Sequence, residues 1–476
     1  MKITTLLLAV LINVASSLVV DASDQRPNIV LIMVDDLSHR NVGAYGAENF
    51  ATPNLDQLAA GGMRFDYCFS MPLCTPSRVA LMTGQHNGRN FFRASTLEAD
   101  QRTFGHLAKA AGYATCVVGK WKLTGKNKKS TPEQFGFDEH CVTEGQRNDS
   151  PRYKNPEILR NGKVEKYNAG EYGPDVVCDY ALNFIEKNKE KPFLLYYPMV
   201  LVHSPLSPVP GSPGYDAADQ RTDDRENYPA MVRRMDENVG RIIAKLSELG
   251  LRERTLILFT GDNGSKKDVE MKSKDGTVYP GGKGNTSDIG VHVPLIMNQP
   301  GRIPVGVSNA LVSFTDFLPT VAEVVGVTLT PDIPCDGQSF LAHGLGKKEA
   351  VGREWIYQWF ANNPQEDKVI EFAFDREFRL YDDGRFYHWS VDLLETKPLL
   401  INSLNGVAKG AYDKLNKALL DSRAALNRPL SYNKEANADF KAAGHEFVWV
   451  EGGDFMAGAE GNASNPKRKS VVNNSF

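Results

Sequence analysis

Short apolar runs alternate with amphipathic segments over the first three quarters of the chain. The run at residues 28–34 is almost wholly apolar and is followed by Asp35 and Asp36, a pattern typical of a buried strand. Similar runs occupy residues 114–118, 193–202 and 255–260. Between the runs lie helical patterns, most clearly at 229–249, where the apolar positions form one stripe. The alternation predicts an α/β fold with a large, mostly parallel central sheet flanked by helices.

The pattern changes after about residue 350, where short alternating segments replace the long apolar runs. The segment FRLYDDGRFYHWSV predicts an antiparallel hairpin around Asp383 and Gly384, and a helical stretch follows at 412–423. We therefore expect four parts in the chain: a leader at 1–22, a main domain at 23–350, a C-terminal α+β subdomain with an antiparallel sheet at 351–440, and a tail at 441–476.

Two stretches, 122–173 and 204–228, are rich in Gly, Pro, Asn and charged residues and are interpreted as long loops. Long loops in compact proteins often bind ligands, although a simple surface insertion is an equally good interpretation.

The first 22 residues resemble a cleaved signal peptide, because Lys2 precedes a short apolar core and Ala22 ends a small-residue cleavage site. The pattern predicts an exported protein, periplasmic or secreted. No later stretch is long and apolar enough to suggest a membrane span.

The composition narrows the possible partners. A net charge of −3 over 476 residues gives no electrostatic reason to expect a nucleic acid or an anionic membrane as a partner. Export permits disulfides, but six cysteines are too few for a disulfide scaffold in a chain of this size.

Oxygen-rich side chains follow two of the expected strands. Asp35 and Asp36 follow the first run, and Asp262 and Asn263 follow the run at 255–260. The carboxyl ends of parallel strands gather at one edge of a sheet, so these side chains could converge. Carboxylate and amide oxygens suit a hard cation such as Ca²⁺ or Mg²⁺, although each pair could equally cap a turn.

Isolated cations and one histidine lie in glycine-rich or strand-end settings. Taken singly, each would be interpreted as a solvated basic side chain or as a histidine whose ring nitrogens are hydrogen-bonded within the protein. Collected at one sheet edge, they would form a pocket for a tetrahedral oxyanion. The candidates are Arg78, Lys120, Lys122, His203 and Lys283.

Cys74 lies in PLCTPSRVALMTG, where Thr75 as N-cap and Pro76 at the first helical position predict a helix start and Gly84 predicts its end. The cysteine would then lie at the positive end of a helix. Taken alone, a buried structural cysteine is the alternative interpretation.

The segment CTPSRVALMTG resembles the signature of the type I, formylglycine-dependent sulfatases of the alkaline phosphatase-like superfamily, C-x-P-S-R followed by L-x-T-G. The resemblance extends to PNIVLIMVDDL, TPNLDQLAAGGMRF, TGDNGS and VSFTDFLPTVAEVVGV, and so covers about residues 26–345. The matching positions are Cys74, Pro76, Ser77, Arg78, Leu81, Thr83 and Gly84.

The resemblance implies an alkaline phosphatase-like sandwich that hydrolyses sulfate esters, with a sulfated carbohydrate as the expected substrate. A formylglycine-generating or sulfatase-maturating enzyme would oxidise Cys74 to Cα-formylglycine (3-oxoalanine), whose hydrate is the nucleophile. Arg78 and Lys120 would hold that hydrate, and His203 and Lys283 would bind the sulfate and protonate the leaving alcohol. Lys120 would also contact the substrate. The implied ligands of Ca²⁺, with Mg²⁺ as a possibility, are Asp35, Asp36, Asp262 and Asn263.

Two positions depart from the family pattern. The family usually has GKWHLG, and this chain has GKWKLTG, with Lys122 at the position of a histidine expected to bond the hydrate. His292 replaces an arginine usual after the GGKG segment, and we treat it as a candidate substrate-binding residue. These departures leave two alternatives: a phosphate or phosphonate ester hydrolase of the same superfamily, and a non-catalytic binder of sulfated glycans.

Overall fold

The computed structural model describes residues 26–125, 130–143, 151–217, 222–365 and 368–426, together with the backbone of two short strands, β17 (His445–Trp449) and β18 (Phe455–Ala459). The expected signal peptide lies outside the described residues. No helix within these ranges is long and apolar enough to cross a membrane.

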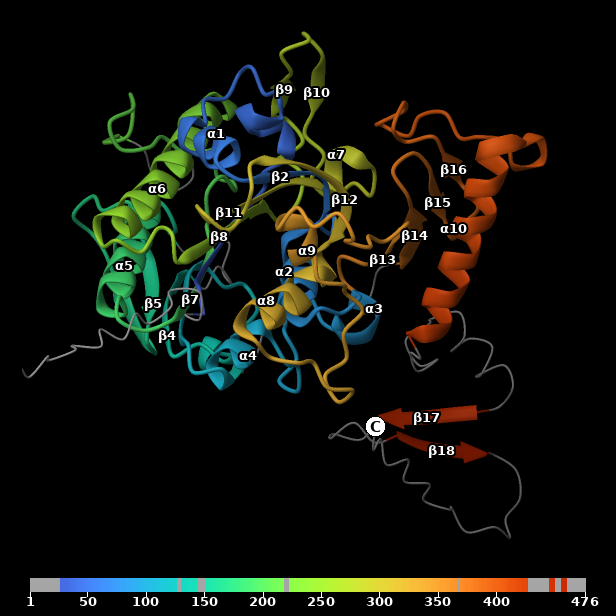
Figure 1. Cartoon of the computed structure of the whole chain (residues 1–476), viewed down its shortest axis with the longest axis horizontal. Helices are drawn as coiled ribbons and strands as arrows, with labels where there is room; N and C mark the ends of the chain where they lie inside the picture. Colours follow the sequence, from blue (N-terminus) through green and yellow to red (C-terminus); the bar gives the residue numbers. More distant parts are fainter. Residues whose placement is uncertain are drawn as a thin grey trace, which may run out of the picture.

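A ten-stranded sheet forms the centre of the molecule (Figure 1). Its order is β12-β2-β11-β8-β1-β7-β3-β4-β5-β6, and all strands run in one direction except β11 and β5. The predicted α/β fold with a mostly parallel sheet is confirmed. The strands are β1 (Asn28–Val34), β2 (Met63–Phe69), β3 (Ala114–Lys120), β4 (Glu139–Thr143), β5 (Glu157–Arg160), β6 (Lys163–Lys166), β7 (Phe193–Pro198), β8 (Thr255–Gly261), β11 (His292–Asn298) and β12 (Gly306–Ser313).

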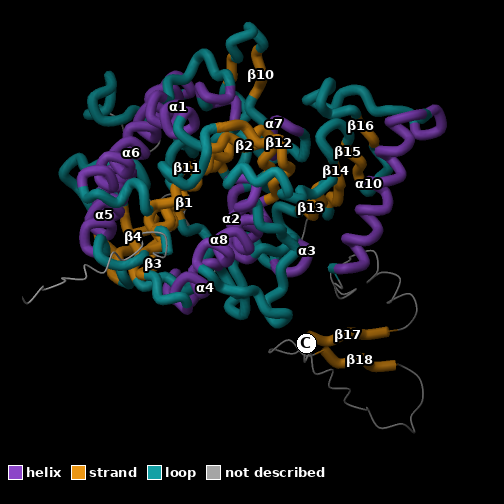
Figure 2. The backbone as a smooth tube through the Cα atoms, viewed as in Figure 1, coloured by secondary structure: helices purple, strands orange, loops and turns teal. Residues whose placement is uncertain are grey.

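Helices cover both faces of the sheet (Figure 2). Alternate residues of β1 point to opposite faces, so Ile29, Leu31 and Met33 belong to one core and Val30, Ile32 and Val34 to another. The first core includes α2 (Cys74–Thr83), α4 (Phe104–Ala110) and α8 (Phe317–Val325), and the second includes α1 (Pro53–Ala60), α5 (Gly173–Lys187) and α6 (Tyr228–Glu248). Both faces of β1 are buried, which explains its unbroken apolar run.

The main part of the chain also contains three shorter α-helices and one small hairpin. They are α3 (Asn87–Asn90), α7 (Asp288–Val291), α9 (Leu341–Gly344), and the pair β9 (Glu270–Lys272) with β10 (Val278–Pro280).

A separate four-stranded antiparallel sheet lies near the C-terminus with the long helix α10 (Gly406–Ala425) (Figure 1). Its strands are β13 (Ile356–Phe360), β14 (Ile370–Phe374), β15 (Arg379–Tyr381) and β16 (Phe386–Tyr387). The predicted hairpin around Asp383 and Gly384 is the β15–β16 pair. Tyr357 and Leu415 of this region are buried in the same core as α2 and α8, so the boundary near residue 350 stays a prediction.

Two expectations about irregular segments were wrong. The segment 122–173 is not one long loop, because it contains β4, β5 and β6, which extend the sheet. The sequences of β5 and β6 are short and partly exposed, so they contain no apolar run to recognise. The expected strand at 193–202 ends at Pro198, and the buried residues 199–202 continue as irregular chain.

Candidate active site

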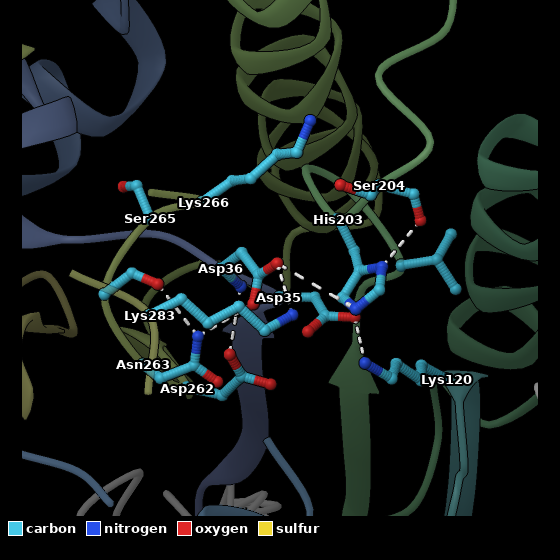
Figure 3. Close-up of polar contacts among 12 residues, drawn as sticks. Asp35, Asp36, Lys120, His203, Ser204, Asp262, Asn263, Ser265, Lys266 and Lys283 are labelled. Atoms are coloured by element: carbon cyan, nitrogen blue, oxygen red, sulfur yellow. Dashed lines mark hydrogen bonds and ion pairs between the residues drawn. The ribbon is translucent and has the colours of Figure 1, made fainter. Parts of the chain in front are cut away.

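The two oxygen-rich clusters meet at one edge of the sheet (Figure 3). Strands β1 and β8 are parallel neighbours with Val34 opposite Gly261, so the residues that follow each strand lie side by side. The backbone N–H of Asp36 donates to Asp262 Oδ1 at 3.0 Å, and Asn263 Nδ2 donates to Asp36 Oδ1 at 2.7 Å. The structure thus brings together all four residues predicted as metal ligands.

The donor set fits a hard cation. Asp35, Asp36, Asp262 and Asn263 are all buried, and Asp35 Oδ1 and Asn263 Oδ1 have no hydrogen-bond partner among the described residues. A buried oxygen without a partner is costly, and a divalent cation would satisfy both atoms. The carboxylate oxygens of Asp35 and Asp36 also lie within 4.8 Å of each other and of a ring nitrogen of His203.

Each carboxylate of this cluster also meets a basic side chain. Arg78 Nη2 of α2 lies 2.9 Å from Asp262 Oδ2, and Lys283 Nζ lies 2.7 Å from Asp36 Oδ2. Lys120, the last residue of β3, forms an ion pair with Asp35. Three of the predicted cations therefore converge on the predicted metal ligands from three separate parts of the chain.

The electrostatics reflect this crowding of buried charges. Burial, together with the nearby charge of Asp35, raises the pKa of the Asp262 carboxyl to about 7. Burial also acts to raise the pKa of Asp35, but Lys120, His203 and Arg78 hold that pKa well below its usual range. A further positive charge, such as that of a bound cation, would therefore stabilise the ionised carboxylates of this cluster.

Cys74 lies beside the carboxylates. Its Sγ and carboxylate oxygens of Asp35 and Asp262 lie within 4.8 Å of one another. The predicted helix is present, but Thr75 is not its N-cap: α2 begins at Cys74 with Leu73 at the cap position. The Ser77 hydroxyl, which bonds the backbone of Met71, ties the helix start to the preceding chain instead. The predicted stop at Gly84 is confirmed, with φ of 69°.

His203 completes this group, although it does not end a strand. It lies five residues beyond β7, in the irregular chain after Pro198. Its Nε2 lies 3.9 Å from Asp36 Oδ2, and its Nδ1 lies 2.6 Å from the Ser204 carbonyl oxygen. Burial lowers the pKa of its imidazole to about 4.

Of the two positions that depart from the family pattern, Lys122 lies near the cluster of carboxylates and His292 does not. Lys122 lies near the cluster, half-buried and with φ of 55°, and burial together with Lys120 lowers the pKa of its amine. His292 is not brought into the cluster: its Nδ1 lies 2.7 Å from Asp288 Oδ1 and its Nε2 lies 2.8 Å from the Asp66 carbonyl oxygen. Both nitrogens of His292 are therefore engaged within the protein, and its role toward the substrate stays a prediction without support from this geometry.

Sequence reasoning missed Arg152, whose Nη1 lies 3.3 Å from Nδ1 of His203. It stands in a segment with no periodicity and no motif, so nothing in the sequence placed it near residue 203.

None of the six cysteines forms a disulfide, and all lie within the described residues. Five of them are buried, and Cys335 is partly exposed.

Comparison with known proteins identifies the family. The sulfatase family model matches residues 27–327. N-acetylgalactosamine-6-sulfatase of Canis lupus familiaris is 32% identical over 366 residues, which cover 70% of this chain and 68% of that protein. Arylsulfatase A of Bos taurus is 31% identical over 368 residues, which cover 68% and 69%.

A solved protein in complex with its substrate D-glucosamine-2-N,6-O-disulfate has the same fold, with a TM-score of 0.71 at 23% identity over 86% of this chain and 100% of that chain. The family match and the sequence relatives decide the assignment, because structural likeness at this identity shows the fold alone. The chain belongs to the sulfatase family and is a sulfuric ester hydrolase.

Proposed function

We propose that this sulfatase hydrolyses sulfate esters of carbohydrates with a formylglycine made from Cys74 and with a bound Ca²⁺. The observation that carries the proposal is the placement of Cys74 Sγ within 4.8 Å of carboxylate oxygens of Asp35 and Asp262, at the start of α2. A nucleophile at this position would lie beside the cation site and beside basic residues that neutralise a sulfate.

The chain's own residues have distinct tasks in this proposal. Arg78 and Lys120 hold the hydroxyls of the hydrate at position 74 and stabilise the ionised one. Lys283 binds the sulfate oxygens, and free N–H groups at the start of α2 add to that attraction. His203 faces the same space through Nε2. In its imidazolium form, which a bound sulfate anion beside the ring favours, it protonates the departing alcohol oxygen from Nε2.

Asp35, Asp36, Asp262 and Asn263 would hold the cation, and Mg²⁺ would suit the same oxygens if it replaced Ca²⁺. The cation, when bound, supplies charge neutralisation for the sulfate and for the ionised hydroxyl.

Biogenesis forms part of the same proposal. The residues 75–78 would be read by a formylglycine-generating or sulfatase-maturating enzyme. The leader at 1–22 would export the protein to the periplasm or the medium.

Mass spectrometry of the tryptic peptide 65–78 tests the nucleophile. In enzyme produced together with a maturation enzyme, position 74 is expected as formylglycine, and Cys74→Ala is expected to abolish turnover of p-nitrophenyl sulfate. Active enzyme whose peptide holds only unmodified cysteine would refute the proposed nucleophile.

Paired assays with p-nitrophenyl sulfate and p-nitrophenyl phosphate test the substrate class. We expect kcat/KM to favour the sulfate ester. A preference for phosphate would support the phosphohydrolase alternative, and binding of sulfated glycans without turnover of any ester by matured enzyme would support the non-catalytic one.

A further inference from the structure

Arg152 is held beside the proposed general acid by a well-anchored segment. Its Nη1 lies 3.3 Å from His203 Nδ1. The next residue, Tyr153, is buried, and its hydroxyl donates to the carbonyl oxygens of Val200 and His203. Lys154 Nζ donates to the carbonyl oxygens of Tyr215 and Asp216, at 3.0 and 2.7 Å. Arg152 is therefore fixed to the loop that carries His203 rather than projecting freely into solvent.

The neighbouring carboxylates are already engaged by other cations. Asp262 pairs with Arg78, Asp35 with Lys120, and Asp36 with Lys283. Within the ranges that the structure describes, the contact of the Arg152 side chain is with an imidazole and not with a carboxylate. Arginine carries its charge at every physiological pH, so this guanidinium can bind an anion that enters the site from outside.

Lys122 adds a second positive charge that influences Arg152's side of the site. Lys122 is half-buried and its backbone is held at φ of 55°, a conformation that side-chain-bearing residues rarely adopt. Besides burial and Lys120, the charge of Arg152 contributes to lowering the pKa of the Lys122 amine. An anion bound at Arg152 would offset this repulsion.

We propose that Arg152 binds a second anionic group of the substrate, a sulfate or carboxylate on the same saccharide as the scissile sulfate. The inference rests on the proposed function and deepens it, because it assigns doubly anionic saccharides as the substrate class. Arg152 would present two N–H groups to that anion, the geometry that carboxylates and sulfates accept best.

If Arg152 had another role, the measured affinities for sugars would change in a different way. If it acted only by orienting His203, its removal would affect singly and doubly charged sugars alike. The discriminating quantity is therefore the ratio of affinities for two sugars that differ by one anionic group.

Titration calorimetry on the full chain with Cys74→Ala, which prevents turnover, measures that ratio. The ligands are D-glucosamine 6-sulfate and D-glucosamine-2-N,6-O-disulfate. We expect the disulfate to bind about 10- to 100-fold more tightly, the range of a charge-assisted hydrogen bond. Adding Arg152→Gln is expected to bring the ratio close to one, Arg152→Lys to retain part of it, and Lys163→Gln, at an exposed cation on β6, to leave it unchanged.

Three results would overturn the inference: a ratio near one in the parent, a ratio that survives Arg152→Gln, or an equal loss for both sugars. Failure of the proposed function has a separate readout, because it would appear as absence of sulfate release by matured enzyme with Cys74 intact. The calorimetric ratio needs no turnover.

Discussion

At the scale of single residues, Lys122 is the most consequential position of the site. The family resemblance places a histidine there, and the structure holds Lys122 half-buried with a left-handed backbone close to Lys120. Burial and neighbouring cations lower the pKa of its amine, which favours a hydrogen-bond donor that can also give up its proton.

Replacing Lys122 by asparagine tests this role, since asparagine tolerates a positive φ and so leaves the backbone undisturbed. We expect kcat/KM for p-nitrophenyl sulfate to fall about 10²- to 10³-fold, the usual effect of losing one donor to a developing oxyanion. Lys122→His should restore much of the activity. Lys267→Asn, at an exposed lysine, is the control, and equal activity of the two asparagine variants would contradict the prediction.

The ring of His292 makes two contacts within the protein that connect separate segments of the fold. Both of its ring nitrogens lie at hydrogen-bond distance from oxygens, those of the Asp288 carboxylate and the Asp66 carbonyl. It joins α7 to β2, and the chain just before it bonds Gly264 and Ser70 through the carbonyls of Gly290 and Val291. The residue thus supports the segments that carry Asn263 and Cys74.

His292→Gln can keep only one of these two donors in place. We expect a loss of about 1–3 kcal/mol in the free energy of unfolding, measured by urea denaturation, because a buried acceptor is left without a partner. His292→Arg retains N–H donors for both acceptors and should be less destabilised. Unchanged stability of the glutamine variant would show that the two bonds contribute nothing.

At the scale of elements, the position of α1 depends on a carboxylate from α6. Asp236 is buried and accepts hydrogen bonds from the backbone N–H groups of Asn54 and Leu55 and from the Asn54 side chain, at 2.8–3.0 Å. These N–H groups belong to the first turn of α1, where no residue of the helix itself can accept from them. One side chain therefore caps a helix more than 180 residues away in the sequence.

Asp236→Ala removes the cap and leaves buried N–H groups without acceptors. We expect the free energy of unfolding to fall by about 2–3 kcal/mol. The neighbouring Glu237→Ala is the matched control, because Glu237 is exposed, its ion pair among the described residues is with Arg234, and such surface pairs contribute little. A similar change in the two variants would argue against the capping role.

At the scale of the whole molecule, the proposed cation site joins parts of the chain that no local contact connects. The ends of β1 and β8 are more than 220 residues apart in the sequence, yet they supply all four proposed ligands. A ligand that binds only the folded arrangement stabilises that arrangement.

Removing divalent cations with a chelator is therefore expected to lower the melting temperature, and Ca²⁺ should restore it. At a hundredfold excess over Kd, the expected stabilisation is about 2.7 kcal/mol. Asp35→Asn should abolish the response to Ca²⁺, whereas Asp275→Asn, at an exposed aspartate, should keep it. A melting temperature independent of Ca²⁺ in the parent would contradict the proposed site.

Local features of the sequence sufficed for several parts of this protein. Apolar periodicity predicted the full length of β1 and both ends of α6 to within about a residue. A buried strand and an amphipathic helix need apolar residues at the positions that face the core, so their own sequences reveal them. The motif around Cys74 and the polar residues after β1 and β8 were equally visible, because catalytic and ligand-binding groups must be particular residue types.

Only the tertiary structure decided which of these residues meet. The three ion pairs of the site, the buried bonds of His292 and the contact of Arg152 with His203 join distant segments, and no local pattern encodes such contacts. Short strands such as β5 and β6 were missed for the same reason, because their partners in the sheet rather than their own apolar content make them strands. Residue type determined the chemistry available to this chain, and folding determined where that chemistry is assembled.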